Sequence, residues 1–346
     1  MGKRSLTKRI LIYELNWLGD ILFSFPLMRA IKEAYPDVYL ACCVVPRYGD
    51  LLVNNPSVDE VLYLSDRRGV SSLLEKAAFV GRVRSRGFDA CILLKPSKTK
   101  AMMARLAGIP ERIGFAGKKS HITREVAVEE GATHRIDQLL RLVSHMDNAI
   151  SDNMYVYHVP EKHLREAERL VERYGKPGNR LIAVNPGGNW DAKRWPAGNF
   201  ADLARGLIRA FPDVNIMVTG AKKDVDLAAR IVDDVGGERC FSVAGLTDLN
   251  LLAALFGMSD LVISADSGPL HLASASGSDT IGLFGPTSEK VTGPRGKGRN
   301  VLISHEVGCR IPCYVEKCGK GHECMKAITV DEVLKVAKKM MGHEDR

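Results

Sequence analysis

The chain has 346 residues, of which 45% are hydrophobic and 26% are charged, and this composition suits a soluble globular protein of about two domains. It excludes a membrane span, because no apolar run approaches the roughly 18–20 residues that a span needs. The formal net charge of +8 suits an anionic partner, whether a nucleic acid, a membrane surface or a phosphorylated substrate.

The N-terminal segment "MGKRSLTKRILIYELNW" is basic and then apolar, like the start of a signal peptide. However, Glu14, Asn16 and Asp20 interrupt the apolar run, and no small-residue cleavage site follows. We therefore expect no signal peptide and a cytoplasmic protein. In that compartment the eight cysteines are expected to be reduced.

The first half alternates apolar runs with helical patterns, which indicates a parallel sheet covered on both faces. Strands are predicted at residues 9–15, 38–45, 60–64 and 89–94, and helices at 20–34, 71–85, 134–147 and 161–174. A linker is predicted at 174–180, where Gly175, Pro177 and Gly178 cluster. The first domain is therefore expected to span residues 1–176.

The second half repeats this pattern and is expected to form a second domain at 177–346, ending in a helix. Its strands are predicted at residues 180–188, 214–220, 240–245, 260–266 and 279–285. The predicted fold class is α/β, with two doubly wound, Rossmann-like domains in tandem. Ligands of such sheets bind beyond the carboxyl ends of the strands, so we expect the site in the cleft between the domains.

The usual nucleotide signatures are absent from these strand-to-helix turns. No G-x-G-x-x-G follows a strand, and the glycines of "GFAGKKS" at 114–120 are too close together for a P-loop. P-loop chemistry is therefore rejected.

The segment "LVISADSGPLHLASASG" at 261–277 carries the strongest pattern. A strand ends at Asp266 and a helix is predicted to begin at Ser267–Pro269, where free N–H groups and the helix dipole favour an anion. Gly268 allows a phosphate to approach the backbone, and His271 lies in the same turn. The alternative is an ordinary helix start with Asp266 as its cap.

Two further turns of the second half suit phosphate and sugar. In "NPGGNWDAKRWPAGNF" at 185–200, Lys193 and Arg194 can hold phosphate or can form a solvated basic pair. In "VTGAKKDVDLAAR" at 218–230, Asp224 can accept hydrogen bonds from ribose or can cap its helix. Together the three turns predict a nucleotide-diphosphate donor.

Asp20 stands where the first apolar strand turns into a helix, so it is either a cap or a catalytic base. The helix dipole and local N–H donors keep the pKa of such a carboxylate low, and we expect it to be ionised at pH 7. It can then accept the proton of a hydroxyl that is becoming an ether. We expect capping and catalysis to be compatible here.

In this order, "NWLGDILFSFPLMRAIKEAYP", "NPGG", "KRWP", "TGAKKD" and "ADSGPLHLASA" resemble glycosyltransferase family 9, the ADP-heptose:lipopolysaccharide heptosyltransferases. The late cysteines look most like the heptosyltransferase II branch. The resemblance implies a GT-B fold and inverting transfer of heptose from ADP-L-glycero-D-manno-heptose to the lipopolysaccharide inner core. It further implies a cytoplasmic protein in peripheral contact with the inner membrane. The N-terminal domain is then expected to bind the acceptor and the C-terminal domain the donor, with no cofactor required.

The resemblance also assigns roles to individual residues. It implies that Asp20 is the catalytic base, that Asp224 contacts adenosine and that Lys193 makes a further contact with the donor. The residues implied to bind the donor diphosphate and sugar are Asp266, Ser267, Gly268 and His271. Two positions depart from the family pattern: Asp224 is shorter than the Glu of some members, and Pro269 is not the residue expected from the family's first branch.

Residues 95–135 hold nine Lys and Arg against four Glu, and we expect part of this surface to meet the anionic acceptor. The candidate acceptor residues are Lys98, Lys118 and Lys119, and the alternative is an ordinary solvated face. With few aromatic residues and no nucleic-acid motif beside the charge, nucleic acid is discounted.

The segment 309–324 contains Cys309, Cys313, Cys318 and Cys324, separated by three, four and five residues. Paired C-x2-C knuckles are the more reliable metal signature, so a structural metal and a reduced, packed loop both stay open.

Two other functions remain as alternatives to heptose transfer. One is a family 9 transferase that uses another nucleotide sugar or acceptor. The other is a catalytically retired donor-binding or scaffold protein of envelope assembly, against which the intact Asp20, Lys193 and His271 speak.

Overall fold

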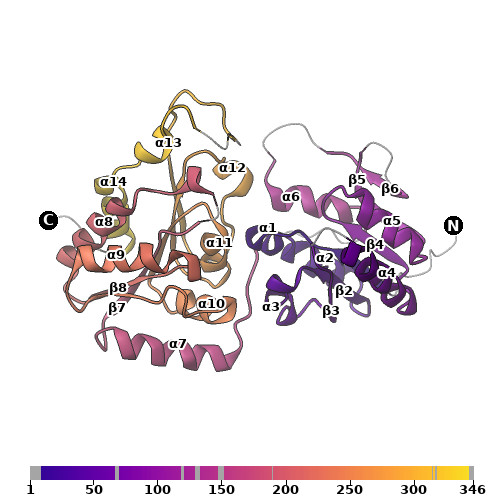
Figure 1. Ribbon diagram of the computed structural model, residues 1–346, viewed down its shortest axis with the longest axis horizontal. Helices are drawn as coiled ribbons and strands as arrows, with labels where there is room; N and C mark the ends of the chain where they lie inside the picture. Colours follow the sequence, from indigo (N-terminus) through magenta and orange to yellow (C-terminus); the bar gives the residue numbers. More distant parts are fainter. Residues whose placement is uncertain are drawn as a thin grey trace. The chain divides into compact units, whose positions relative to one another are not determined.

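The computed structural model describes residues 9–66, 70–117, 121–128, 133–146, 152–188, 190–313, 315 and 318–342. The chain divides into two compact units, Met1–Asn153 and Met154–Arg346. Each unit is built on one six-stranded parallel sheet with helices packed against it (Figure 1). The predicted fold class, two Rossmann-like α/β domains in tandem, is confirmed.

The sheet of the first unit has the order β3-β2-β1-β4-β5-β6. The strands are β1 (Arg9–Tyr13), β2 (Tyr39–Val44), β3 (Glu60–Tyr63), β4 (Ala90–Leu93), β5 (Glu111–Phe115) and β6 (Arg124–Val126). The chain builds outward from β1 to β3 and then restarts on the other side with β4. The strand order therefore reverses between β1 and β4, and ligands of such sheets bind beside that reversal.

The helices of the first unit are α1 (Leu18–Leu22), α2 (Phe25–Ala34), α3 (Asp50–Val53), α4 (Val70–Ser85), α5 (Lys98–Leu106) and α6 (Arg135–Leu140). The single helix predicted at 20–34 is thus divided into α1 and α2. Pro26, the second residue of α2, has no N–H to continue the hydrogen bonding of α1, and Ser24 becomes the N-cap of α2.

The second unit repeats the arrangement with the order β12-β11-β10-β7-β8-β9. Its strands are β7 (Arg180–Asn185), β8 (Val214–Val218), β9 (Cys240–Ser242), β10 (Leu261–Ala265), β11 (Thr280–Phe284) and β12 (Asn300–Ser304). Here the order reverses between β7 and β10, which pair directly.

The helices of the second unit are α7 (Glu161–Tyr174), α8 (Ala197–Ala210), α9 (Val225–Val235), α10 (Leu249–Gly257), α11 (Gly268–Ala275), α12 (Glu289–Thr292), α13 (Glu323–Lys326) and α14 (Val330–Met340). Helices α8, α9 and α14 bury their apolar faces on the sheet, and Trp195 packs edge-on against Phe200 there. The predicted C-terminal helix is α14.

The boundary between the units lies after Asn153, not after residue 176 as the Gly- and Pro-containing turn had suggested. The segment from Met154 onward is bound to the second unit: Tyr157 donates its N–H to Ala275 O (2.8 Å) and its hydroxyl to Asn250 Oδ1 (2.6 Å). Helix α7 then packs against α10 and buries Ala167 completely. The turn at 174–180 is therefore a connection inside the second unit.

Of the helices in the described ranges, none combines the length and the apolar character needed to cross a bilayer. The 16-residue helix α4, for example, carries Arg82 and Arg84 in its last turn.

Candidate functional site

The predicted donor residues of the second unit follow β7, β8 and β10, so they lie at the carboxyl edge of three neighbouring strands. Lys193 ends the 3-10 helix η3 (Asp191–Lys193) after β7, and Asp266 directly follows β10. The Lys193 Nζ atom donates to Asp266 Oδ2 at 2.7 Å. This contact spans the point where the strand order reverses, which is the preferred place for a ligand in such sheets.

Asp266 is 4% exposed and has three side-chain partners. Besides Lys193, Thr287 Oγ1 donates to its Oδ2 at 2.6 Å, and His271 Nε2 lies 3.3 Å from its Oδ1. Burial alone would raise the pKa of Asp266, but the hydrogen bond from His271 and the charge of Lys193 outweigh it and hold the pKa well below its usual range. Asp266 is therefore ionised and fixed in place.

The ring of His271 is held from both sides. Its Nε2 faces Asp266, and its Nδ1 lies 3.3 Å from the hydroxyl of Tyr155, which also accepts a hydrogen bond from Arg295 N (3.2 Å). Tyr155 is completely buried, and burial raises its pKa, so the hydroxyl keeps its proton. Sequence reasoning missed Tyr155, because the segment around it has no helical or strand periodicity.

Helix α11 begins at Gly268 with Ser267 as its N-cap, which confirms the predicted start. Ser267, Gly268 and Pro269 are partly exposed, and the N–H groups of a first helical turn lack intrahelical acceptors. The alternative with Asp266 as the cap is wrong, since its carboxylate is bound by Lys193 and Thr287 instead. This helix start can accept an anion.

Asp224 is almost completely buried in the turn after β8, within the 3-10 helix η4 (Lys222–Asp224). Its Oδ2 accepts the N–H of Ala221 at 3.1 Å, and Arg194 Nη2 lies 3.9 Å from its Oδ1. A Cβ atom on Gly187 would lie 2.7 Å from the same Oδ2, so any other residue there would displace the Asp224 carboxylate. Asp224 therefore has a clear local role in its turn, and its contact with ribose stays a prediction.

A buried polar network that sequence reasoning missed joins the ends of β7, β8 and β10. Asn185 Nδ2 donates to Ser264 Oγ (3.3 Å) and to Gly187 O (3.2 Å), and Thr219 Oγ1 donates to Asn185 Oδ1 (3.2 Å). Buried polar side chains without such partners would be costly. The network therefore fixes the three strand ends that carry the predicted donor residues.

In the first unit, Asp20 lies in the first turn of the five-residue helix α1. The N-cap is Trp17, and Asp20 is the third residue of the helix. The Asp20 side chain is 26% exposed, and its Oδ1 lies 4.0 Å from Arg135 Nε on α6. It is thus a partly accessible carboxylate at the carboxyl end of β1, as a base requires.

The candidate acceptor residues are only partly described. Lys98 is exposed at the start of α5, whereas Lys118 and Lys119 lie outside the described residues. Other cations of this stretch are engaged internally: Arg124 pairs with Glu111 (2.9 Å), and Lys100 Nζ donates to Glu14 O (2.7 Å).

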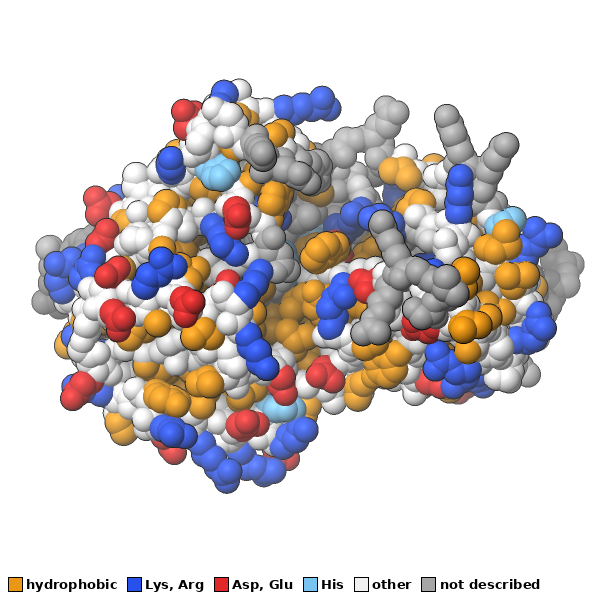
Figure 2. Space-filling view, viewed as in Figure 1, with side chains coloured by type: hydrophobic (Ala, Val, Ile, Leu, Met, Phe, Trp, Pro, Cys, Tyr) orange, Lys and Arg blue, Asp and Glu red, His pale blue; other side chains and the backbone are white. Residues whose placement is uncertain are grey.

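On the face that Figure 2 shows, Lys and Arg side chains are spread over the described surface with acidic side chains among them. Part of the excess of Lys and Arg at residues 95–135 thus forms contacts within the fold, as Arg124 and Lys100 do.

The four late cysteines form no disulfide; Cys309 is exposed and the other three are half-buried. Within the described ranges, no group of three or more His, Cys, Asp or Glu side chains is arranged to hold a metal ion. The structural metal stays a prediction.

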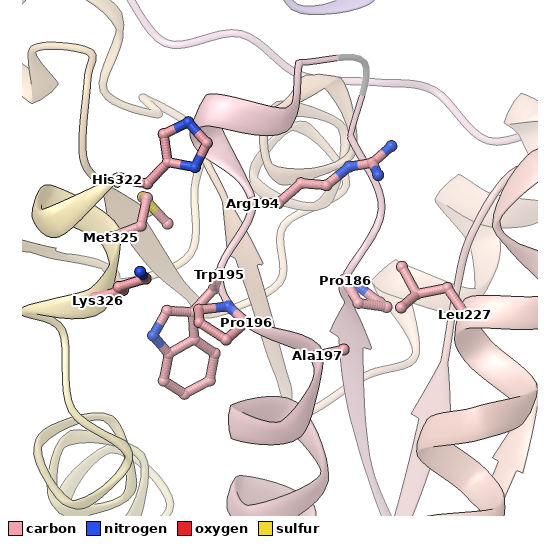
Figure 3. A pocket seen from close by; sticks show the side chains of 9 residues that line it. All are labelled: Pro186, Arg194, Trp195, Pro196, Ala197, Leu227, His322, Met325 and Lys326. Carbon is pink, nitrogen blue, oxygen red and sulfur yellow. The ribbon is translucent and has the colours of Figure 1, made fainter. Parts of the chain in front are cut away.

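A cavity of about 300 Å³ lies beside the start of α8 (Figure 3). Arg194 and Trp195 line it from the turn after β7, and His322, Met325 and Lys326 line it from the late segment. Arg194, one of the two cations predicted to hold phosphate, lines this cavity, whereas Lys193 and Asp266 do not. Sequence reasoning missed it because its walls are far apart in the chain.

Comparison with known proteins places these features in a context. The model of glycosyltransferase family 9 (heptosyltransferase) matches residues 77–322. Lipopolysaccharide heptosyltransferase 2 of Escherichia coli (strain K12) is 24% identical over 357 residues, with 97% of this chain and 99% of that protein covered. Lipooligosaccharide heptosyltransferase 2 of Haemophilus ducreyi is 26% identical over 359 residues, with 96% and 99% covered.

Solved structures share the fold of the whole chain. E. coli ADP-heptose lps heptosyltransferase II superposes with a TM-score of 0.81 at 22% identity, covering 98% of this chain and 100% of that one. E. coli heptosyltransferase WaaC with ADP has a TM-score of 0.74 at 17% identity, covering 96% and 99%. Both similarities extend over the two units.

Proposed function

The chain belongs to glycosyltransferase family 9, the heptosyltransferases, and from this we propose that it moves heptose from ADP-L-glycero-D-manno-heptose to the lipopolysaccharide inner core with inversion. The observation that carries the proposal is the cluster of half-buried Lys193 with buried Asp266 and His271 beside the first turn of α11. Relatives named lipopolysaccharide heptosyltransferase 2, aligned over nearly the full chain, support the choice of sugar and acceptor.

In the proposed reaction, the donor diphosphate lies at the start of α11. The N–H groups of Ser267, Gly268 and Leu270 and the ammonium of Lys193 stabilise the negative charge that develops on the departing ADP. Asp266 and His271 hold Lys193 and the helix start in position. These groups carry the leaving-group charge, so the proposal needs no tightly bound cation, and Asp224 is assigned to the adenosine side.

Asp20 is the proposed general base. The acceptor oxygen attacks the anomeric carbon from the face opposite ADP and gives its proton to the Asp20 carboxylate, while the bond to the diphosphate breaks. Positioned general-base catalysis of this kind accelerates a reaction by roughly 10²–10⁴-fold. The partial exposure of Asp20 in a helical first turn supports this role.

The acceptor side rests on charge. Lys98, with Lys118 and Lys119 on the same stretch, is proposed to face the anionic inner core, and no nucleic acid is expected as a partner. A net charge of +8 supports peripheral contact with the anionic cytoplasmic face of the inner membrane.

A donor panel tests the function. The purified chain is incubated with a Kdo-bearing or heptosylated acceptor and with ADP-heptose, UDP-sugars or GDP-sugars, and nucleotide release and acceptor mass are measured. We expect heptose transfer with ADP-heptose alone. Turnover with another sugar would favour the other family 9 transferase, and donor binding without turnover would favour the scaffold protein.

A further inference from the structure

Glu14 is a buried acid that the proposed reaction does not use. It directly follows β1, at the reversal point of the first sheet, and is 1% exposed. Its backbone is fixed on both sides, since its N–H donates to Cys43 O (2.9 Å) and its carbonyl accepts Lys100 Nζ (2.7 Å). A carboxyl group at this depth is costly unless it is paired or neutral.

The carboxyl of Glu14 has polar partners, and its nearest cation, Lys100, acts on it only through its charge. Both of its oxygens lie 3.2 Å from Ser24 Oγ, and Leu15 N lies 3.4 Å from Oε2. Within the described part of the chain, no Lys or Arg nitrogen forms an ion pair with this carboxyl, and Lys100 Nζ binds the Glu14 backbone oxygen.

The geometry of Ser24 indicates where the proton lies. Ser24 Oγ is 2.6 Å from the carbonyl oxygen of Ile21, which can only accept, and a hydroxyl has one proton to donate. The shorter contact favours donation of the Ser24 proton to Ile21, which a neutral Glu14 carboxyl leaves undisturbed, whereas an ionised Glu14 carboxylate would compete as an acceptor for the same proton. Burial, with a smaller contribution from the charge of Asp20, raises the pKa of Glu14 to about 8, against opposite effects of Ser24, Leu15 and Lys100.

This chain of hydrogen bonds ends on the helix that carries Asp20. Ser24 binds the Ile21 carbonyl through both its hydroxyl and its N–H (3.0 Å), and Ile21 neighbours Asp20 in α1. A helix of five residues is too short to be stable by itself, so α1 depends on such contacts.

The other ionisable groups around Glu14 come from three elements. Asp20 is on α1, Lys100 is on α5, and Cys42 and Cys43 are on β2. Burial raises the pKa of both thiols, that of Cys43 to about 12, so both are neutral near pH 8. Burial lowers the pKa of Lys100.

We propose that Glu14 is a positioning residue for the base Asp20: its neutral carboxyl leaves intact the Ser24–Ile21 hydrogen bond that holds α1, and loss of its proton turns Ser24 away from Ile21 and reduces turnover in alkaline solution. The ionised carboxylate accepts the Ser24 proton, so the bond to Ile21 is lost. The inference rests on the proposed role of Asp20, whereas the protonation of Glu14 can be tested without activity.

The protonation is tested by infrared titration of the carboxyl C=O stretch in the full chain and in the Glu14→Gln variant. We expect the wild-type protein to show, at pH 7, a protonated-carboxyl band that the variant lacks and that disappears with an apparent pKa of about 8. Identical bands in the two proteins at pH 7 would overturn the proposal.

The positioning role is tested by the ratio of kcat at pH 9 to kcat at pH 7 in wild type, Glu14→Gln and Glu33→Gln. Glu33 is an exposed acid on α2 and serves as the matched control. We expect the ratio to be at most about 0.2 in wild type and the control, and near 1 in Glu14→Gln, whose amide stays neutral at every pH.

Equal ratios in wild type and Glu14→Gln would overturn the proposal. If Asp20→Asn keeps normal turnover, the proposed base fails, and the positioning role fails with it, while the infrared result still reports the state of Glu14.

Discussion

Asp20 combines partial exposure with a fixed helical turn, and its substitution is the sharpest residue-scale test of the chemistry. In Asp20→Asn the side chain keeps its size but cannot accept the acceptor's proton. We expect turnover to fall by at least about 100-fold, with the fold and the affinity for ADP retained. The measurement is kcat with ADP-heptose, alongside ADP titration by calorimetry.

The matched control for this prediction is Asp37→Asn. Asp37 is an exposed acid between α2 and β2 and should leave turnover unchanged. Near-normal turnover of Asp20→Asn would contradict the role of base.

At the residue scale, the sequence predicted that Lys193 and Asp266 lie together, but not the residues that hold them. Lys193 and Asp266 could be predicted because residues that follow parallel strands meet at one edge of the sheet. Thr287 also follows a strand, β11, and that signal could have found it. Tyr155 could not be predicted from the sequence. Glu14 was visible only as a charge that interrupts an apolar run, because its protonation state depends on the partners that folding brings to it.

At the scale of elements, the close packing of the β7–η3 connection against the turn after β8 makes Gly187 a critical position. In Gly187→Ala, the new Cβ atom would push the Asp224 carboxylate away from Ala221 N. We expect a loss of about 1–3 kcal/mol in the free energy of unfolding and a higher KM for the donor. Denaturant unfolding and donor kinetics measure the two effects.

Gly198→Ala is the control substitution in the neighbouring element. A Cβ atom at Gly198 meets nothing within 4 Å, and alanine favours the helix α8. Its stability should be unchanged or rise by up to about 1 kcal/mol. Equal effects of the two substitutions would contradict the steric argument.

Apolar runs predicted the central strands well, because strands buried on both faces are apolar at every position. They missed β5, β6 and β12, whose ends or faces are only partly buried and which carry Glu111, Arg112 and Arg124 among their residues. They also placed α7 in the wrong unit, since periodicity reveals an amphipathic helix but not the surface it covers.

The packing of α7 on α10 yields a prediction about fragments. A fragment of residues 154–346 keeps α7 and the Tyr155 and Tyr157 contacts, so we expect it to unfold cooperatively. A fragment of residues 177–346 exposes the α10 surface that α7 covers, and we expect it to aggregate or to lose the cooperative transition. Calorimetry of both fragments gives the answer, and identical behaviour would contradict the boundary after Asn153.

At the scale of the whole molecule, the two units are expected to respond to pH in opposite ways. The raised pKa of Glu14 means that the folded first unit retains a proton that the unfolded chain loses, so stability declines as pH rises from 4.5 to about 8. The lowered pKa of Asp266 means that its contribution is present above pH 3.8 and is lost as pH falls toward the folded value.

The prediction is measured as the pH dependence of the free energy of unfolding. The advantage of Glu14→Gln over wild type should grow with pH between 5 and 8, by at most about 1.4 kcal/mol per unit. The disadvantage of Asp266→Asn should shrink below pH 3.8. Parallel curves for either variant and wild type would contradict the corresponding assignment.

The contact between Lys193 and Asp266 has a consequence for the catalytic cycle. The Lys193 ammonium already has a carboxylate as its counter-ion. In the proposed reaction, the pyrophosphate of an incoming donor therefore competes with Asp266 for Lys193. When ADP departs, Lys193 returns to Asp266. The ammonium of Lys193 therefore has a negatively charged partner throughout the proposed reaction. Such a resident anion weakens donor binding and hastens product release, which favours repeated turnover over tight retention of nucleotide.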